Sequence, residues 1–347
     1  MKKIAFLNIY SGVIERGSEI FVSEIAERLS LYTQVDVYQV GLTEGKKYRV
    51  KQIKGIPKTS TFYHLWVGLF TLKCLPDLWK NKYDYVIRVN GRLQTIICRL
   101  FRFLRGGKIL ISGHSGMGFD DRFNLLFGNP DIFVALTPDA YTWAKNFKSK
   151  SAIQLIANGV DTEKFKPGMK KTDLKFKCPL VLCVAALEEY KRIDRLILAV
   201  ENLKDVNLLV IGQGPLKIHL EELGRQKLGN RFRLLEYIPN DKLPEIYNSV
   251  QVFSLPSKES EAFGLVYLEA LACNLPVVAP DDRNRRELIG EVGFYCNVEN
   301  KSEYAHTLRK ALETSLGNKP RERSLNYSWE KIARKYYQVM VENYDQH

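Results

Sequence analysis

Residues 250–278 read VQVFSLPSKESEAFGLVYLEALACNLPVV, and this stretch decides how the second half of the chain folds. A strand-like run over 250–255 enters an acidic, hydroxyl-rich loop. A short apolar helix then begins at Leu265, and a second strand-like run follows over 276–279. A strand, a helix and a second strand in this order predict a parallel α/β sheet.

The turn from loop to helix in this stretch predicts an anion site. Gly264 stands at the turn, and the backbone N–H groups of Phe263, Gly264 and Leu265 can point at an anion. Glu261 and Glu269 bracket the turn. Eight residues at about 100° per residue leave them on different sides of a helix, so we expect them to have different roles. A phosphate site with an acid on each side suggests a polyol phosphate ligand, such as a nucleotide sugar.

Length and composition limit the class of protein. A chain of 347 residues is too long for one ordinary core and predicts two domains. No run approaches the roughly 20 apolar residues of a membrane span, and 1–8 indicate a first strand rather than a secretory signal. Six scattered cysteines without a CxxC pair predict reduced core residues of a cytosolic protein, with neither a disulfide framework nor a zinc site: Cys74, Cys98, Cys178, Cys183, Cys273 and Cys296.

The positive charge is unevenly distributed. Residues 1–166 carry 25 Lys and Arg against 14 Asp and Glu, whereas residues 167–347 carry 27 against 25. The net charge is therefore +11 in the first part and +2 in the second. An excess of this kind favours an anionic partner of the N-terminal half, which means nucleic acid, an anionic lipid surface or a phosphorylated acceptor.

Strand and helix patterns alternate along both halves of the chain. The strands are expected at 3–10, 35–40, 85–89, 108–112, 132–136, 151–156, 180–185, 206–212 and 232–237. The helices are expected at 19–31, 62–79 with a break near Pro76, 93–104, 193–203, 215–224 and 329–344. Residues 167–177 are polar and basic and predict a linker. The domains are then 1–166 and 178–325, with a helix over 326–347 packing back toward the N-terminal domain.

Two short segments of the N-terminal half are candidate ligand contacts. Gly17 and Ser18 begin a helix, which indicates either a second anion site or an ordinary helix cap after a tight turn. His114 lies between glycines at the carboxyl end of a strand, where open α/β sheets bind ligands, although a structural histidine is the alternative. These positions predict that the N-terminal domain contributes to binding.

The segments 62–79 and 93–104 are apolar and, in the second case, rich in arginine. Arg99, Arg102 and Arg105 stand among leucine, isoleucine and phenylalanine residues. One interpretation is that both segments lie on a membrane surface, with the arginines against lipid phosphates. The other is that the apolar faces pack on the sheet and the arginines are solvated.

Motifs along the whole chain resemble retaining glycosyltransferases of family 4. The match consists of Glu261 and Glu269 with seven residues between them, the Phe263-Gly-Leu265 turn, and several shorter motifs in the same order. These are Arg16-Gly-Ser-Glu19, Asn158-Gly-Val-Asp161 with Phe165 and Pro167, Tyr190-Lys-Arg-Ile-Asp194, Gly212-Gln-Gly-Pro215 and Ser328-Trp-Glu330. The order and spacing of the motifs agree from the first strand to the last helix.

The resemblance implies an α/β protein of the GT-B fold, with two Rossmann-like domains facing across an interdomain cleft. It implies a retaining, hexosyl-type transferase that uses a UDP-, GDP- or ADP-linked sugar, needs no metal ion, and acts on a glycan or lipid-linked acceptor. Cell-envelope polysaccharide or glycolipid synthesis in the cytoplasm, at the inner face of the membrane, is the expected setting. Retention in this family is ascribed to departure and attack on one face, so no carboxylate nucleophile is assigned.

The resemblance also assigns roles to residues. Glu269 would bind the ribose hydroxyls and Glu261 the sugar ring, while Phe263, Gly264 and Leu265 offer backbone N–H groups. Lys191 would neutralise the leaving diphosphate. The remaining assignments are Gly17 and Ser18 to the diphosphate, His114 to the transferred sugar, and Tyr237 and Ile238 to the base.

One departure from the family pattern concerns the charge beside the phosphate. The usual arginine of a Gly-Arg-Leu turn is Ala186 here, and Arg192 is the candidate replacement, unless it is solvated or paired with Asp194. Arg283, Arg285 and Arg286 form a further basic cluster that reaches donor or acceptor, or else an exposed loop.

Four other classes compete with glycosyl transfer. A nucleotide-sugar 2-epimerase shares the fold, and a non-catalytic sugar-nucleotide-binding scaffold would explain Ala186. A dinucleotide-dependent oxidoreductase is disfavoured because Lys217 replaces the third glycine of the fingerprint after Gly212 and Gly214. A nucleic-acid-binding module is disfavoured because the chain has no aromatic and basic platform motif, so no nucleic acid partner is expected.

Overall fold

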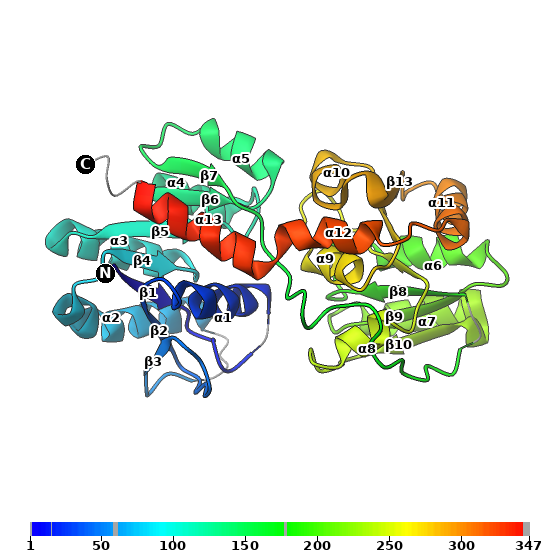
Figure 1. The fold of residues 1–347 in the computed structure, drawn as a ribbon, viewed down its shortest axis with the longest axis horizontal. Helices are drawn as coiled ribbons and strands as arrows, with labels where there is room; N and C mark the ends of the chain where they lie inside the picture. The colour runs from blue at the N-terminus through cyan, green and yellow to red at the C-terminus, as the bar shows by residue number, and fades with distance from the viewer. Residues whose placement is uncertain (1, 15, 58–61, 177–178, 343–347) are drawn as a thin grey trace. The chain divides into compact units, whose positions relative to one another are not determined.

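The computed structural model of the protein describes residues 2–14, 16–57, 62–176 and 179–342. These residues form two compact units (Figure 1). Unit 1 contains the chain up to Asn158 together with the segment from Trp329 onward, and unit 2 is Gly159–Ser328. Each unit has its own parallel β-sheet with helices packed on it, so the α/β class expected from the sequence is confirmed.

Unit 1 is built on a seven-stranded parallel sheet in the order β3-β2-β1-β4-β5-β6-β7. The strands are β1 Lys3–Leu7, β2 Gln34–Gln39, β3 Arg49–Gln52, β4 Tyr85–Arg88, β5 Lys108–Ser112, β6 Ile132–Ala135 and β7 Ala152–Leu155. The helices are α1 Gly17–Leu29, α2 Tyr63–Asn81, α3 Arg92–Arg105, α4 Phe119–Leu126, α5 Pro138–Lys145 and α13 Trp329–Glu342. The central strands are buried along their length because helices cover them, which explains their continuous apolar runs.

Unit 2 repeats this plan with six parallel strands in the order β10-β9-β8-β11-β12-β13. The strands are β8 Leu180–Val184, β9 Asn207–Ile211, β10 Phe232–Leu235, β11 Val252–Ser254, β12 Val277–Pro280 and β13 Gly293–Cys296. The helices are α6 Ile193–Glu201, α7 Lys217–Leu228, α8 Leu243–Tyr247, α9 Leu265–Ala272, α10 Arg283–Ile289, α11 Lys301–Glu313 and α12 Lys319–Ser324. The stretch 250–278 therefore supplies β11, α9 and β12, which is the strand–helix–strand order read from the sequence.

The units divide at other residues than those expected from the sequence. The turn before Pro167 packs within unit 2, where Arg321 donates to the carbonyls of Thr162 and Phe165. The predicted linker also packs on unit 2, since the Thr172 N–H donates to Ser249 Oγ at 2.8 Å. Residues 177 and 178 lie outside the described residues. Low apolar periodicity in 167–176 thus marks irregular backbone lying on a domain rather than a connection between domains.

The C-terminal helix α13 packs on unit 1. The Tyr85 hydroxyl donates to the carbonyl of Met340 at 2.8 Å, and the hydroxyls of Ser112 and Tyr336 are 2.9 Å apart. The chain thus enters unit 2 after Asn158 and returns to unit 1 at Trp329. Five of the cysteines are buried as free thiols, while Cys178 lies outside the described residues: Cys74, Cys98, Cys183, Cys273 and Cys296.

The expected break at Pro76 is wrong, because α2 runs through it as one helix. Pro76 lies on the exposed side of α2, where the Leu72 carbonyl that it cannot bond has room to tilt outward. Within the described ranges, no helix combines the length and the apolar character that crossing a bilayer requires.

Candidate functional site

The order of strands reverses once in each sheet, between β1 and β4 in unit 1 and between β8 and β11 in unit 2. Loops that leave two such strands diverge at the carboxyl edge of the sheet and open a crevice, which is where α/β sheets bind ligands. Several candidate site residues lie on these loops, and the others follow neighbouring strands at the same edge or lie on α9.

We call the place where the strand order reverses the crossing point of each sheet. At the crossing point of unit 2, Lys191 and Glu261 lie next to each other. Lys191 ends a short 3₁₀ helix, Glu189–Lys191, after β8, and Glu261 lies in the loop that follows β11. Their side chains form an ion pair, and each side chain is only 10% exposed. Two residues separated by 70 positions are thus brought together.

The loop after β11 is fastened from one side by Arg192. Its guanidinium donates to the carbonyls of Pro256 and Ser257 at 2.8 and 3.0 Å, and to Glu299 at 2.7 Å. The side chain is therefore neither merely solvated nor paired with Asp194, as the alternative interpretation had it. These contacts hold the loop in place, and they do not support the predicted replacement of the arginine missing at Ala186.

A second arginine, Arg285, fastens the same loop from within the core. It is 2% exposed, donates to Ser257 Oγ and to the Lys258 carbonyl at 2.8 Å each, and pairs with Asp282 at 3.0 Å. The expected exposed loop is wrong, because Arg283–Ile289 form α10. The expected contact of Arg285 with donor or acceptor is not supported, because its guanidinium is directed at the loop. Asp282 is the sequence feature that could have predicted this helix, because its side chain caps the helix by accepting a hydrogen bond from the Arg285 N–H.

The start of α9 has the geometry expected of an anion site. Gly264 has φ of +87°, and a Cβ added there would lie 2.7 Å from the ring of Tyr267, so only glycine suits this turn. Across the described part of the chain, the N–H groups of Phe263, Gly264 and Leu265 donate to no backbone carbonyl. The sequence prediction of three donors at one turn agrees with this arrangement.

Glu269, on the same helix, has surroundings different from those of Glu261. Its carboxylate accepts a hydrogen bond from the Tyr247 hydroxyl at 2.9 Å. Burial raises the pKa of Glu269, and the bond from Tyr247 partly opposes the shift. One acid is therefore paired with a cation and the other with a phenol, in line with the expectation of separate roles.

Two glycines after β9 position the turn that contains Ala186. A Cβ on Gly212 would lie 1.8 Å from the Ala185 carbonyl oxygen, and one on Gly214 would lie 2.5 Å from the Leu187 carbonyl oxygen. The two loops therefore touch backbone to backbone, which requires glycine. Tyr237 and Ile238 follow β10 at the same edge, and Tyr237 is exposed.

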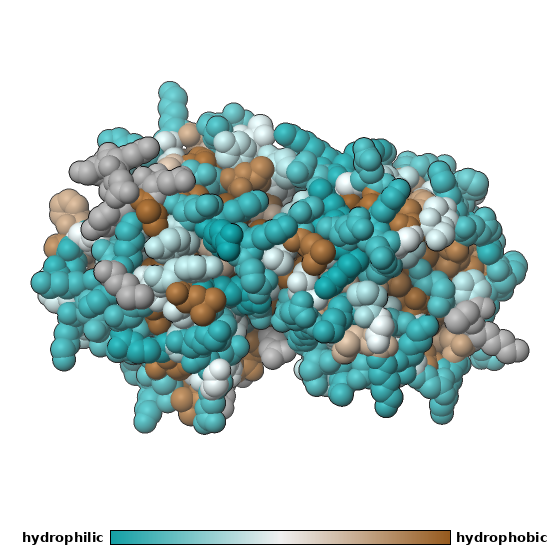
Figure 2. All heavy atoms as spheres, in the orientation of Figure 1, coloured by the Kyte–Doolittle hydropathy of each residue, from teal (hydrophilic) through white to brown (hydrophobic). Residues whose placement is uncertain are grey.

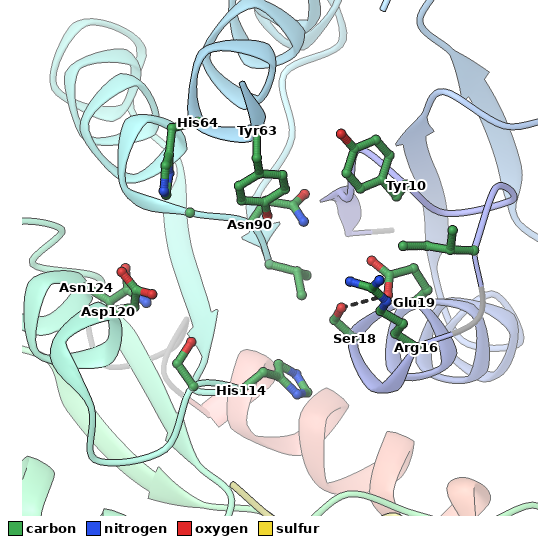
Figure 3. Close-up of a pocket in the computed structure, with 14 residues that line it drawn as sticks. Tyr10, Arg16, Ser18, Glu19, Tyr63, His64, Asn90, His114, Asp120 and Asn124 are labelled. Atoms are coloured by element: carbon green, nitrogen blue, oxygen red, sulfur yellow. Dashed lines mark hydrogen bonds between the residues drawn. The ribbon is translucent and has the colours of Figure 1, made fainter. Parts of the chain in front are cut away.

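In unit 1 the crossing point is a cavity of about 520 Å³ (Figure 3). Its walls come from the loops after β1, β4 and β5 and from the starts of α1, α2 and α4. The lining residues are Tyr10, Ile14, Arg16, Ser18, Glu19, Tyr63, His64, Val89, Asn90, Gly91, His114, Ser115, Asp120 and Asn124. Ser18 and His114 thus share one cavity, whereas Gly17, the first residue of α1, is not part of its lining.

The polar groups of this cavity include several that sequence reasoning missed. Figure 3 shows Tyr10, Tyr63 and Asn90 across the opening from His114. Asn90 lies two residues beyond the end of β4, where the strand order reverses, and this position would have identified it had the strand order been known. Ser18 Oγ donates to Glu19 at 2.9 Å, and burial raises the pKa of Glu19.

His114 is neutral at physiological pH. Burial lowers its pKa to about 4, and its ring lies 4.5 Å from that of Phe21, measured between centroids. Its Nε2 atom is buried and has no hydrogen-bond partner within the described residues. A neutral imidazole with an unused nitrogen at a cavity wall can accept or donate one hydrogen bond to a ligand.

Asp121 holds the loop that carries His114. Its carboxyl group accepts from the Ser115 N–H at 3.1 Å and from Asn124 at 3.0 Å, and burial raises its pKa to about 7. Arg88, fully buried below the cavity, donates to the Asn90 carbonyl at 2.6 Å. Its Nε and Nη2 atoms have no partner among the described residues, and burial lowers its pKa to about 10.

Comparison with known proteins shows which family the sequence resembles. Residues 165–333 match the family described as glycosyl transferases group 1. A sulfoquinovosyl transferase of Arabidopsis thaliana is 30% identical over 210 residues, which cover 54% of this chain and 40% of the relative. A phosphatidyl-myo-inositol mannosyltransferase of Mycobacterium tuberculosis is 28% identical over 222 residues, covering 59% of this chain and 58% of the relative. The chain thus spans about half the length of these relatives.

Solved structures of similar shape cover the whole chain. A sucrose-phosphate synthase from Thermosynechococcus elongatus has a TM-score of 0.82 at 20% identity over 100% of both chains. The Anabaena protein HepE, in complex with UDP and glucose, has a TM-score of 0.79 at 18% identity, over 99% of this chain and 100% of the other. The fold of these structures is GT-B, so the predicted fold is confirmed.

Proposed function

We propose that the chain, whose residues 165–333 match the glycosyl transferases of group 1, moves a sugar from a nucleotide-diphosphate sugar to a hydroxyl group of a glycan or lipid-linked acceptor. The names of two matched relatives, a sulfoquinovosyl transferase and a phosphatidyl-myo-inositol mannosyltransferase, support a sugar donor, and the second supports a lipid acceptor. The donor would bind unit 2 and the acceptor unit 1.

The observation that carries the proposal is the Lys191–Glu261 pair where the strand order of unit 2 reverses, between the segment after β8 and the loop that leads into α9. Lys191 would neutralise the charge that develops on the diphosphate as it leaves. Glu261 would accept hydrogen bonds from the sugar ring, and the N–H groups at Gly264 would bind phosphate or sugar oxygens. Glu269 would accept from the ribose hydroxyls.

The transfer would proceed with retention of configuration. The bond from the anomeric carbon to the diphosphate breaks on the same face on which the acceptor oxygen forms its new bond, and the proton of the acceptor hydroxyl passes to the departing diphosphate oxygen. No protein carboxylate becomes glycosylated. His114, neutral at physiological pH, would hydrogen-bond the transferred sugar rather than act as a cation. Ser18 and the backbone at Gly17 would bind phosphate at the start of α1.

The proposed setting is the cytoplasmic face of a membrane, where a lipid-linked acceptor is accessible. No metal ion is assigned to the reaction, because Lys191 and the helix N-terminus supply the positive charge that a divalent ion would otherwise bring. Transfer is therefore expected to persist in excess chelator.

The test is transfer from a panel of UDP-, GDP- and ADP-sugars, with analysis of product stereochemistry. Lys191→Ala is expected to lower kcat roughly 10²-fold, because a preorganised charge at the leaving group is lost. Lys217→Ala is the matched control, since this exposed lysine is paired with Glu236 in the same unit and is expected to leave kcat unchanged.

Three results would contradict the proposal. An epimerised nucleotide sugar without any acceptor would indicate the 2-epimerase. Tight donor binding without turnover for every sugar tested would indicate a non-catalytic scaffold. A near-wild-type rate for Lys191→Ala would remove the role of the ion pair in the reaction.

A further inference from the structure

Helix α3 is apolar on the side that faces away from the sheet. The side chains that it buries are Gln94, Thr95 and Cys98, which are polar or small. Those that it exposes are large and apolar: Leu93, Ile96, Leu100, Phe103 and Leu104. Phe103 is 88% exposed and Leu104 70%. A surface helix in water has the opposite arrangement, so the outer side of α3 is suited to an apolar contact.

Helix α2 adds a second apolar stripe beside the first. Its exposed residues Leu65, Leu69, Leu72 and Trp79 recur every three, four or seven positions and thus lie along one side. The two helices pack closely, since a Cβ added to Gly68 of α2 would lie 3.2 Å from Leu93 of α3. Trp79 and Phe101 also contact edge to face, with 6.1 Å between centroids. We call the outer side of α2 and α3, as defined by these exposed residues, the α2–α3 face.

Single exposed apolar residues are ordinary in this protein, but a cluster of this size is not. Figure 2 shows hydrophobic residues at the surface of both units in that view. Among the described residues, however, the large and strongly exposed ones number 18 in unit 1 and three in unit 2, and nine of the 18 lie on the α2–α3 face. The difference points to an interaction surface of unit 1 rather than to ordinary surface composition.

The charge around this face is positive. The two helices carry Lys73, Lys80, Arg92, Arg99, Arg102 and Arg105 against a single acid, Asp77. The structure corrects the sequence interpretation of Arg99, Arg102 and Arg105, because these arginines make specific contacts within unit 1 and are not simply solvated. Arg99 donates to the Phe127 carbonyl, Arg102 pairs with Asp131, and Arg105 stacks on Trp79.

A cavity of about 420 Å³ lies where both helices end. Four basic residues and two acidic ones line it: Lys82, Arg102, Arg105, Lys108, Asp84 and Asp131. Phe101 and Leu78 complete the lining on the side of the helices. The apolar stripes therefore end beside a recess with excess positive charge.

We propose that the α2–α3 face docks on an anionic lipid bilayer and that the basic recess at the ends of both helices receives lipid headgroup phosphate. The apolar stripes would enter the boundary between headgroups and acyl chains, while Lys80 and Arg105 contact phosphates at the rim. Charge complementarity selects a bilayer over an apolar protein partner, because the six cations of the two helices still outnumber the acids beside them, which are Asp77 on α2, Asp120 paired with Arg92 and Asp131 paired with Arg102. Docking goes beyond the proposed transfer and does not depend on it.

The experiment is flotation of the full chain with vesicles, without any sugar donor. Vesicles of phosphatidylcholine mixed with an equal amount of phosphatidylglycerol are compared with vesicles of phosphatidylcholine alone. Phe103→Ser with Leu104→Ser is expected to weaken binding at least tenfold, because two large side chains no longer leave water. Ile218→Ser in unit 2, which removes a side chain that is 71% exposed, is the matched control and is expected to change nothing.

The electrostatic part is tested separately with Lys80→Gln and Arg105→Gln. Each is expected to weaken binding to the anionic vesicles roughly fivefold and to reduce its salt dependence. Equal binding to both vesicle types, or unchanged binding of the Phe103 and Leu104 double variant, would overturn the proposal. So would a dimer in sedimentation equilibrium that the double variant dissociates, because the face would then be covered by a second copy of the chain.

Discussion

The crossing points of the two sheets differ in how firmly their loops are held by side-chain contacts. In unit 2 the loop after β11 is held by Arg192, by buried Arg285 and by the Lys191–Glu261 pair. In unit 1 the corresponding place is an open cavity where polar atoms remain without partners in the described structure, namely Tyr10 Oη and His114 Nε2. Side-chain hydrogen bonds and ion pairs thus hold the loop of unit 2, whereas two buried side-chain atoms at the cavity of unit 1 remain without partners among the described residues.

This difference indicates how each site meets its ligand. A loop whose donors and acceptors are already in place needs no reorganisation to stabilise developing charge. A buried polar atom without a partner costs about 1–3 kcal/mol, so the unit 1 cavity gains when a ligand supplies the missing bonds. We therefore expect unit 2 to be preorganised for the donor and unit 1 to be ordered further by its ligand.

The largest effect is expected from a variant that releases the loop after β11 in unit 2, because this removes the difference between the two units. Arg285→Ala is expected to destabilise unit 2 by about 3–5 kcal/mol, because Asp282 loses its partner and the loop loses two hydrogen bonds within the core. Arg286→Ala is the matched control on the same helix, since that exposed arginine pairs with exposed Asp281 and lies over the ring of Tyr295. Native-state hydrogen exchange reports each unit separately.

A small effect of Arg285→Ala on exchange in unit 2 would contradict the proposed fastening of the loop. So would an effect equal to that of Arg286→Ala. Loss of protection confined to the loop after β11, with β8 and β9 unchanged, would instead show that the arginine acts only locally.

The arginine contacts show where prediction from the sequence ends. The strand–helix–strand order of 250–278 and the strand over 108–112 followed from local apolar pattern, and that pattern is the same in the folded protein. Arg285 and Ser257 are 28 positions apart, and Arg192 and Pro256 are 64 apart. Their meeting depends on the order of strands in the sheet, which no local pattern contains.

The α2–α3 face shows a second limit of the same kind. Periodicity identified α3 as a helix with an apolar side, but the direction in which that side points is set by packing. Helix α3 buries Cys98 and Thr95 and exposes Leu100, so the apolar side is outward. Likewise Pro76 predicted a break on local grounds, yet it lies on the exposed side, where a helix tolerates it.

The second prediction concerns Asp121 and sharpens the account of unit 1. Its folded pKa of about 7 lies above the ordinary value for an unfolded chain, so the unfolded state releases its proton first as pH rises. Stability from this group is therefore present at acid pH and declines between about pH 4 and pH 7, by about 2 kcal/mol or more.

Asp121→Asn removes this titration and is expected to flatten the dependence of unit 1 stability on pH in that range. Hydrogen exchange of β5 and α4 at several pH values measures the slope, and unit 2 in the same sample serves as the internal control. An unchanged slope in the variant would show that Asp121 remains ionised in the folded protein and that Arg88 compensates its burial.

The smallest expected effect is the difference in stability between Gly264→Ala and Gly317→Ala, which tests whether the anion site of unit 2 depends on one backbone conformation. Gly264→Ala introduces a side chain at φ of +87° and a contact of 2.7 Å with the Tyr267 ring. Gly317→Ala also introduces a side chain at positive φ, +57°, but with no atom within 4 Å. The control isolates the backbone strain of about 1–2 kcal/mol, and the contact with Tyr267 is expected to add about 1 kcal/mol or more.

Calorimetric titration with nucleotide-diphosphate sugar should show weaker binding for Gly264→Ala alone. Equal loss of stability in both variants, with donor affinity unchanged, would show that the N–H groups at the start of α9 do not bind the donor.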